Sequence, residues 1–290
     1  MCQTLKVNRS YYYEIADQLA HPAPDPDKLL KDALKKQFER HRENYGQRRL
    51  IIELAAEGFD VGRCKIRRLM KELGLKTRYP KRFRVTTNSK HTYKIADNAL
   101  NRQFNPVFPN QVWCSDITYL WTNEGWCYLA VVMDLYSRQV VEWSVQDHMR
   151  TSLCTNALTM AWWNRKRPQG VLHHSDRGSQ YASDDYQKHL MRYGMKASMS
   201  RKGNCWDNSP TERVFRTLKS EWLNRFNFQS KAEAKAAVWE YITYYNAHRR
   251  HSVLGYQSPM EFEQSMAQAS LKSVWFYLTI TQGHTPSRRS

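Results

Sequence analysis

The stretch VWCSDITYLWTNEGWCYLAVVMDLYSRQVVEWSV, residues 112–145, decides the fold. Three runs rich in β-branched and aromatic residues, at about 113–120, 126–133 and 139–145, are separated by the short polar segments TNEG and DLYSR. Runs of this composition are typical of strands, and connections this short join antiparallel neighbours. We therefore expect an antiparallel meander of three strands.

Alternating helices and strands follow the meander. The sequence predicts a helix at about 151–165, the strand VLHH at 171–174, a helix near 183–193, the strand KASM at 196–199 and a long helix that starts near Ser209. This order is that of an α/β domain in which helices cover a mixed sheet of five strands.

Three acidic residues lie on three separate predicted elements. Asp116 is in the first strand, Asp176 follows the fourth strand, and Glu212 is in the first turn of the helix within NSPTERVFRTLKSEW. If the first and fourth strands are neighbours, the two aspartates approach each other, and the helix can add Glu212. Carboxylates gathered in this way suit Mg²⁺ or Mn²⁺. Two such ions, roughly 3.5–4 Å apart, support in-line phosphoryl displacement.

Local sequence also offers structural roles for these acids. Asp176, in HHSDRGSQY, could simply form a turn. Ser209 and Glu212 fit a capping box, with Pro210 at the first helical position, although a cap does not exclude a ligand role. Arg216 and Lys219 lie four and seven residues after Glu212, on one helix face. They could bind DNA phosphates or form a salt bridge with Glu212.

The region upstream, residues 29–75, has a helix-turn-helix pattern. In its last helix Ile66, Leu69, Met70 and Leu73 form one apolar face. The remaining surface is basic and carries Arg63, Lys65, Arg67, Arg68 and Lys71. Such a helix could lie in a major groove with its basic flank on phosphates, although an ordinary solvated face looks similar.

Positive charge continues beyond this helix. The segment KTRYPKRFRVTTNSKHTYK (76–94) includes Lys81, Arg82 and Arg84, and reads as an extended basic connector that can follow a phosphate backbone or merely link domains. The chain has 45 Lys and Arg against 27 Asp and Glu, a formal charge of +18. This excess favours a polyanionic partner, with nucleic acid before membrane.

Several further features limit the class of protein. The six cysteines contain no CxxC pair, so reduced thiols are expected, and no apolar run approaches the roughly 20 residues of a membrane span. We therefore expect a cytoplasmic protein. Asp134 is interpreted as a turn residue, and strand packing is expected for at least one of His173 and His174. Trp206 could stack on a base or serve as a buried anchor.

The motifs divide the chain into six parts. We predict an N-terminal helical segment and linker at 1–26, a helix-turn-helix domain at 27–76 and a basic linker at 77–110. A catalytic core is predicted at 111–228, its C-terminal helical part at 229–268, and a tail of unknown role at 269–290.

The spacing of the three acids completes a family pattern. There are 59 residues between Asp116 and Asp176 and 35 between Asp176 and Glu212. Together with VWCSDITYL, EGWCYLAVVMDLYSR, HHSDRGSQY, SMSRKGNCWDNSPTERVFRTLKSEW and YNAHRRHSVLGYQSPMEF, this spacing resembles bacterial insertion-sequence transposases. The match is to the second-frame (OrfB) product of the "insertion sequence three" family, which is similar to retroviral integrases, and it spans about residues 30–263.

The resemblance implies an RNase H-like core in which Asp116, Asp176 and Glu212 form a D, D-35-E triad that binds two divalent metal ions. Family members cut one strand at the element's ends to free a 3′-OH, which then attacks another phosphodiester without a covalent enzyme intermediate. The implied partners are the element's terminal repeats, target DNA and further copies of the chain.

The sequence departs from the family pattern in two respects. Full transposases of this family fuse the product of an upstream frame (OrfA), with its leucine zipper, to the second-frame product, and this chain lacks sustained zipper heptads. The zinc-binding module of retroviral integrases is replaced by the helix-turn-helix. Two other functions therefore stay open: a DNA-binding regulator of transposition without catalysis, and an RNase H-like nuclease that only hydrolyses.

Overall fold

The structure, a computed structural model, describes residues 8–20, 25–77 and 92–269. It divides into two compact units, Met1–Arg78 and Tyr79–Ser290. The predicted basic residues Lys81, Arg82 and Arg84 lie outside the described residues. None of the helices in the described ranges combines the length and hydropathy that a membrane span requires.

The first unit is helical, as predicted. A separate helix α1 (Arg9–Ala20) precedes α2 (Lys28–Arg40), α3 (Gln47–Ala56) and α4 (Arg63–Glu72). The last three share a core to which α4 contributes Ile66, Leu69 and Met70. Gly58, with φ at +90°, allows the turn after α3 because only glycine adopts this conformation without strain. The predicted helix-turn-helix is therefore confirmed.

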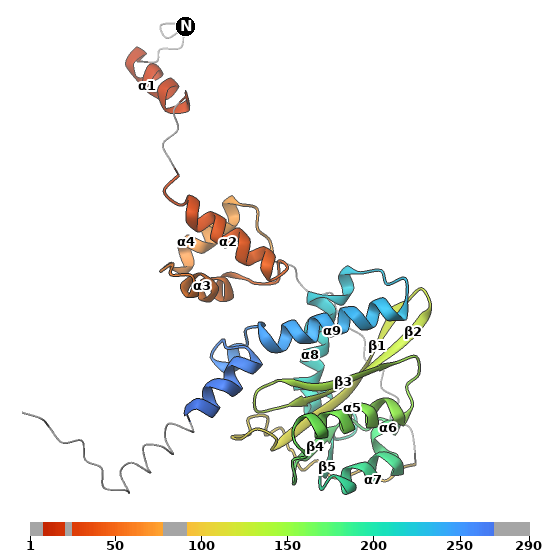
Figure 1. Cartoon of the computed structure of the whole chain (residues 1–290). Helices are drawn as coiled ribbons and strands as arrows, with labels where there is room; N and C mark the ends of the chain where they lie inside the picture. The colour runs from red at the N-terminus through yellow and green to blue at the C-terminus, as the bar shows by residue number, and fades with distance from the viewer. Residues whose placement is uncertain (1–7, 21–24, 78–91, 270–290) are drawn as a thin grey trace, which may run out of the picture. The chain divides into compact units, whose positions relative to one another are not determined.

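The second unit is built on a mixed sheet of five strands (Figure 1). The strands are β1 (Val112–Thr122), β2 (Gly125–Asp134), β3 (Val140–Gln146), β4 (Leu172–Ser175) and β5 (Lys196–Met199), in the order β3-β2-β1-β4-β5. The first three pair antiparallel, which confirms the meander, and β4 is parallel to both β1 and β5. The sheet thus has the predicted number of strands and the predicted mixture of directions.

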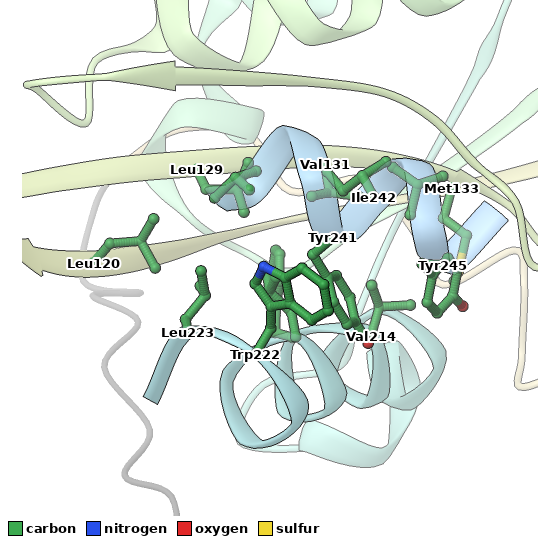
Figure 2. Packing of buried hydrophobic residues seen from close by; sticks show 14 of the residues in the cluster. Leu120, Leu129, Val131, Met133, Val214, Trp222, Leu223, Tyr241, Ile242 and Tyr245 are labelled. Carbon is green, nitrogen blue, oxygen red and sulfur yellow. The ribbon is translucent and has the colours of Figure 1, made fainter. Parts of the chain in front are cut away.

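Helices cover both faces of the sheet. On one face lie α5 (Thr151–Asn164), α6 (Ser179–Ala182) and α7 (Asp184–Arg192), which bury Trp113 of β1. On the other lie α8 (Ser209–Glu221) and α9 (Lys231–Ala247), which bury Cys114 and Leu120. Figure 2 shows this second core, in which Trp222 and Tyr241 pack against the sheet. Because side chains alternate along a strand, the face that carries Cys114 also carries Asp116.

A buried ion pair holds the ends of α8 and α9 together. Arg249, just after α9, donates from Nε and Nη2 to the two carboxylate oxygens of Glu221 at 2.8 and 2.7 Å. Tyr241 donates a third hydrogen bond to Glu221 at 3.3 Å. Both charges are almost fully buried, so the bidentate geometry is needed to offset their desolvation. The pair fixes the helix that carries Glu212.

Candidate active site

The pairing of β1 with β4 places two of the predicted acids side by side. The parallel register aligns Cys114 with His174, and Asp116 and Asp176 each lie two residues further along the chain. Two parallel chains advance in step, so the carboxylates come to neighbouring positions at the carboxyl end of β4. The condition set by the sequence, that the first and fourth strands be neighbours, is met.

Glu212 reaches the same region because the start of α8 is tied to β1. Asn208 donates from Nδ2 to the carbonyl oxygen of Ser115 at 3.2 Å, and its Oδ1 accepts from Thr211 Oγ1 at 3.0 Å. Asn208 and Thr211 are both buried. One amide therefore connects the residue before Asp116 to the residue before Glu212.

The expected capping box at the start of α8 is wrong. Ser209 is the first residue of the helix, not its N-cap, and the preceding residue, Asn208, ends a 3₁₀ turn, Cys205–Asn208. A capping box needs an extended residue before the helix, and the chain here enters α8 directly from another helical turn. The box therefore supplies no competing role for the half-buried Glu212.

The electrostatics of the three acids are coupled. Burial raises the pKa of Asp116 well above its usual value, and the charges of Asp176 and then Glu212 raise it further. Burial also raises the pKa of Glu212, with Asp176 adding to the effect and Arg216 opposing it. The carboxylates therefore act on one another and create a region of strong negative potential.

The loop after β4 gives Asp176 a structural role as well. Its Oδ1 accepts a hydrogen bond from the backbone N–H of Gly178 at 2.9 Å. A side chain at Gly178 would bring a Cβ within 3.0 Å of the same oxygen, so glycine leaves room for the carboxylate. The turn interpretation of Asp176 and its position beside Asp116 are thus compatible.

Lys219 extends from α8 between the acids and an aromatic ring. Its Nζ lies 4.4 Å from the centroid of the Tyr119 ring. Burial lowers the pKa of Lys219 to about 8, while the Asp116 carboxylate opposes that change. Arg216, one helical turn earlier, is exposed. Both predicted cations therefore share the helix face of Glu212, and Lys219 lies closer to the interior.

The two histidines before Asp176 are packing residues. His173 Nε2 lies 2.9 Å from Ser115 Oγ and 3.0 Å from the hydroxyl of Tyr186. His174 Nδ1 lies 2.9 Å from Ser198 Oγ. Burial lowers the pKa of His173 to about 3 and that of His174 to about 4, so both rings are neutral. The strand-packing interpretation holds for both residues.

Asp207 is an anchor that the sequence analysis missed. It is fully buried and accepts hydrogen bonds from Arg201, Arg102 and Asn98 at 2.8–3.0 Å. The hydrogen bonds from Arg201 hold the pKa of this carboxyl well below its usual range. Its neighbour Trp206 is 69% exposed, so the buried-anchor alternative for the tryptophan is wrong. The sequence gives little signal for Asp207, because its partners Arg102 and Asn98 lie more than a hundred residues away in sequence.

Two of the five cations on the basic face of α4 form ion pairs within the protein. Its five predicted cations are all exposed. However, Lys65 and Arg68 form ion pairs with Asp27 at 2.7 and 3.0 Å. Arg63, Arg67 and Lys71 have no ion pair with another described residue. The sequence could not reveal this division, because Asp27 lies at the start of α2.

The three carboxylates do not form a closed metal-binding cluster. Among residues 8–20, 25–77 and 92–269, no three His, Cys, Asp or Glu side chains are close enough to hold one ion together. Asp134, at the end of β2, is a turn residue as predicted, because its Oδ1 accepts from the backbone N–H of Tyr136 at 3.0 Å. The site is thus an open group of acids beside the carboxyl end of β4.

Known protein families match most of the chain. Residues 24–83 match the "HTH-like domain" family, and residues 106–205 and 193–259 match two "Integrase core domain" families. The chain is 45% identical over 269 residues to the insertion element IS600 uncharacterized 31 kDa protein of Shigella sonnei, covering 92% of this chain and 99% of that protein.

A second relative is the transposase InsF for insertion sequence IS3A of Escherichia coli (strain K12). It is 39% identical over 266 residues, covering 91% of this chain and 92% of the relative. Among solved structures, the HTLV-2 integrase catalytic core domain in complex with magnesium is 18% identical. That likeness covers 54% of this chain and 97% of the other, with a TM-score of 0.43.

Proposed function

This chain belongs to the family of transposases of insertion sequence IS3, and on that premise we propose that Asp116, Asp176 and Glu212 form the centre at which it cuts and joins DNA strands. The chain is a transposase, a polynucleotidyl transferase with an integrase core and an HTH-like domain.

The convergence of the acids carries this proposal. Asp116 and Asp176 share a register across β1 and β4, and the Asn208 amide links the start of α8 to the same strand. Burying negative charges together is costly without a compensating function, as the raised pKa of Asp116 indicates.

The donor set suits a divalent cation. Carboxylate oxygens are the ligands that Mg²⁺ and Mn²⁺ prefer, and a cation among these acids lowers their mutual repulsion. We assign two ions to the site, which Asp116, Asp176 and Glu212 would hold. Such ions would supply activation of the attacking oxygen and stabilisation of the leaving oxygen. The protein's own contribution is to hold the acids on three rigid elements.

The basic residues of α8 position the substrate strand. Arg216 is exposed on the face of Glu212, and Lys219 lies between Asp116 and the Tyr119 ring. Phosphate oxygens at the acids would otherwise meet a repulsive potential, which these cations reduce. We therefore assign both residues to the phosphates beside the scissile bond.

The helix-turn-helix unit binds the element's terminal repeats through α4. Arg63, Arg67 and Lys71 are exposed cations for DNA phosphates or base edges. Lys65 and Arg68 contact DNA when their ion pairs with Asp27 break. Lys81, Arg82 and Arg84 are proposed to follow the phosphate backbone. Target DNA is the second nucleic-acid partner.

Two further partners complete the proposal. Joining the two ends of one element requires that both be held together, which favours several copies of the chain on DNA. We also propose a product of the upstream frame as a partner or fusion. Gel filtration of the chain on paired element ends, with and without that product, tests both statements.

A strand-transfer assay tests the proposed centre. Duplexes are taken from the DNA on either side of the coding sequence, with one 3′-OH already exposed, and incubated with a plasmid target and Mg²⁺. We expect joined product from the unmodified chain and none from Glu212→Gln, with DNA binding retained in both. Release of short fragments without any joining would favour a purely hydrolytic nuclease. Binding without either product would favour a regulator.

A further inference from the structure

Three aromatic side chains gather near the turn of the β1–β2 hairpin. Trp121 and Trp126 are paired directly across the two strands, and their ring centroids lie 4.8 Å apart in an edge-to-face arrangement. Tyr119 lies 5.1 Å from Trp126, also edge to face. We call Tyr119, Trp121 and Trp126 the hairpin aromatics.

These rings are not used by the core. Trp121 is 55% exposed and Trp126 is 45% exposed. Neither tryptophan belongs to the hydrophobic clusters of the described residues, whereas Leu120 and Cys127, their neighbours in sequence, are buried under α8 and α9. Exposed aromatic clusters expose a large apolar area to water, so they mark binding surfaces more often than scattered apolar residues do.

Lys219 connects the hairpin aromatics to the proposed active site. Tyr119 follows Asp116 by three residues on β1, about 10 Å along a strand, and Trp121 follows by five residues, about 17 Å. Because side chains alternate along a strand, these odd offsets turn both rings toward the face of β1 opposite to Asp116. Lys219 links the two sides, since its Nζ lies 4.4 Å from the Tyr119 ring centroid and its charge acts on Asp116.

The charge around the hairpin favours an anionic occupant. The acid of the hairpin turn, Glu124, accepts a hydrogen bond from the backbone N–H of Lys231 at the start of α9, at 2.8 Å. Its negative charge is thus compensated by the positive end of a helix. Lys219 adds a positive charge next to the rings. An occupant with phosphates and flat apolar faces matches both properties.

We propose that the hairpin aromatics stack on unpaired nucleobases of the DNA strand whose phosphate lies at Asp116, Asp176 and Glu212. This inference rests on the proposed function, because it takes the position of the strand from the acids. Base pairs in an intact duplex hide their faces in the stack, so only separated bases can be bound in this way. Stacking tolerates any base, because every base has a π-face.

The distance fits a short unpaired segment. The separation of about 10–17 Å along β1 corresponds to roughly three to five base steps at about 3.4 Å each. The surface therefore binds bases a few nucleotides from the scissile phosphate. Stabilising separated bases there lets the scissile bond approach the acids without the complementary strand.

The test measures binding rather than catalysis. The full chain is titrated, without divalent metal, against a short fluorescent duplex with a blunt end, the same duplex with a short unpaired tail, and a tail of abasic nucleotides. We expect about tenfold tighter binding of the unpaired tail than of the blunt end. Trp126→Ala and Trp121→Ala remove most of this preference, and Trp126→Phe keeps part of it.

A matched control variant and a cycle that combines the protein change with the DNA change make the result specific. Trp239→Ala removes a tryptophan that is even more exposed, at 61% on α9, and keeps the preference of the unmodified chain. The abasic tail lowers binding by the unmodified chain as much as Trp126→Ala does, and the two changes together cost no more than either alone. Additive losses would mean that the ring and the bases do not touch.

Two outcomes overturn the inference. The first is an unchanged preference for unpaired DNA in both tryptophan variants. The second is that the tryptophan variants keep the DNA affinity of the unmodified chain but sediment with a lower mass. That result would make the hairpin an interface between copies of the chain. The binding test does not require strand transfer, so the two proposals can fail separately. If the chain joins strands but does not prefer unpaired DNA, only the stacking inference is wrong. If the chain prefers unpaired DNA but does not join strands, only the catalytic proposal is wrong.

Discussion

The side chain of Asn208 joins the two halves of the proposed active site: its Nδ2 donates to the carbonyl of Ser115 at 3.2 Å, and its Oδ1 accepts from Thr211 at 3.0 Å. Ser115 precedes Asp116, and Thr211 precedes Glu212. The distance between an acid on the sheet and an acid on a helix is thus set by one buried amide.

Replacing this amide should misplace Glu212 without removing it. We expect Asn208→Ala to lower the rate of strand transfer by about 10- to 100-fold, because small displacements in a catalytic centre have effects of that size. DNA affinity should stay close to that of the unmodified chain, since Asn208 is buried. Single-turnover rates and binding isotherms measure the two quantities separately. Equal losses in affinity and rate would contradict a positioning role.

The anchor at Asp207 gives a prediction about stability and pH. The hydrogen bonds of Arg201 hold the pKa of Asp207 below its usual range, so the ionised form stabilises the fold. This stabilisation is complete above the unfolded pKa, about 3.9, and is lost as the pH falls through the folded pKa. Asp207→Asn should lower the melting temperature most at neutral pH and progressively less below about pH 4. A difference that does not change with pH would contradict this account.

Removing one partner of the buried Arg249–Glu221 pair should destabilise the fold more than replacing both residues with apolar ones. Removing one partner leaves a buried charge, so Arg249→Ala should lower the free energy of unfolding by about 3–5 kcal/mol. The double variant Arg249→Met, Glu221→Leu should lose much less, because no charge stays buried. Urea denaturation of the single and double variants measures this coupling. Additive losses would show that the pair is not a unit.

Two neighbouring arginines of α4 should differ in their effect on DNA binding. Arg67 has no ion pair with another described residue, whereas Arg68 contacts Asp27 at 3.0 Å. Arg67→Ala should therefore weaken binding and make the salt dependence shallower by about 0.9, the value for one phosphate contact. Arg68→Ala should weaken binding with a smaller change of slope. Equal slopes for Arg67→Ala and the unmodified chain would move the DNA contact elsewhere.

Local pattern was sufficient for the elements and for the acids as candidates. The strands of residues 112–145 are rich in β-branched and aromatic residues and end at short turns, so the meander could be predicted, and the strand KASM matches β5 at both ends. That β4 lies beside β1 could only be posed as a condition, because a parallel neighbour is reached through the long connection that contains α5. The position of Asp116 beside Asp176 depends on that crossover.

Sequence patterns could not predict which residues contact each other across the fold. Asp27 binds Lys65 and Arg68 from another helix, and Asp207 gathers Arg102 from more than a hundred residues away. The capping box was wrong because a 3₁₀ turn runs directly into α8 and makes Ser209 helical. These contacts form only after the chain has folded, so no spacing in the sequence indicates them.

The central claim is that Asp176, with Asp116 and Glu212, binds the metal that supports strand joining. The most direct measurement is metal rescue of Asp176→Cys, because a thiolate disfavours Mg²⁺ and accepts softer ions such as Mn²⁺ or Cd²⁺. We predict that this variant binds DNA, fails to join it in Mg²⁺ and recovers joining when Mn²⁺ or Cd²⁺ is supplied. Joining in Mg²⁺ at the unmodified rate, or no recovery with the softer ions by a protein that still folds and binds DNA, would contradict the account.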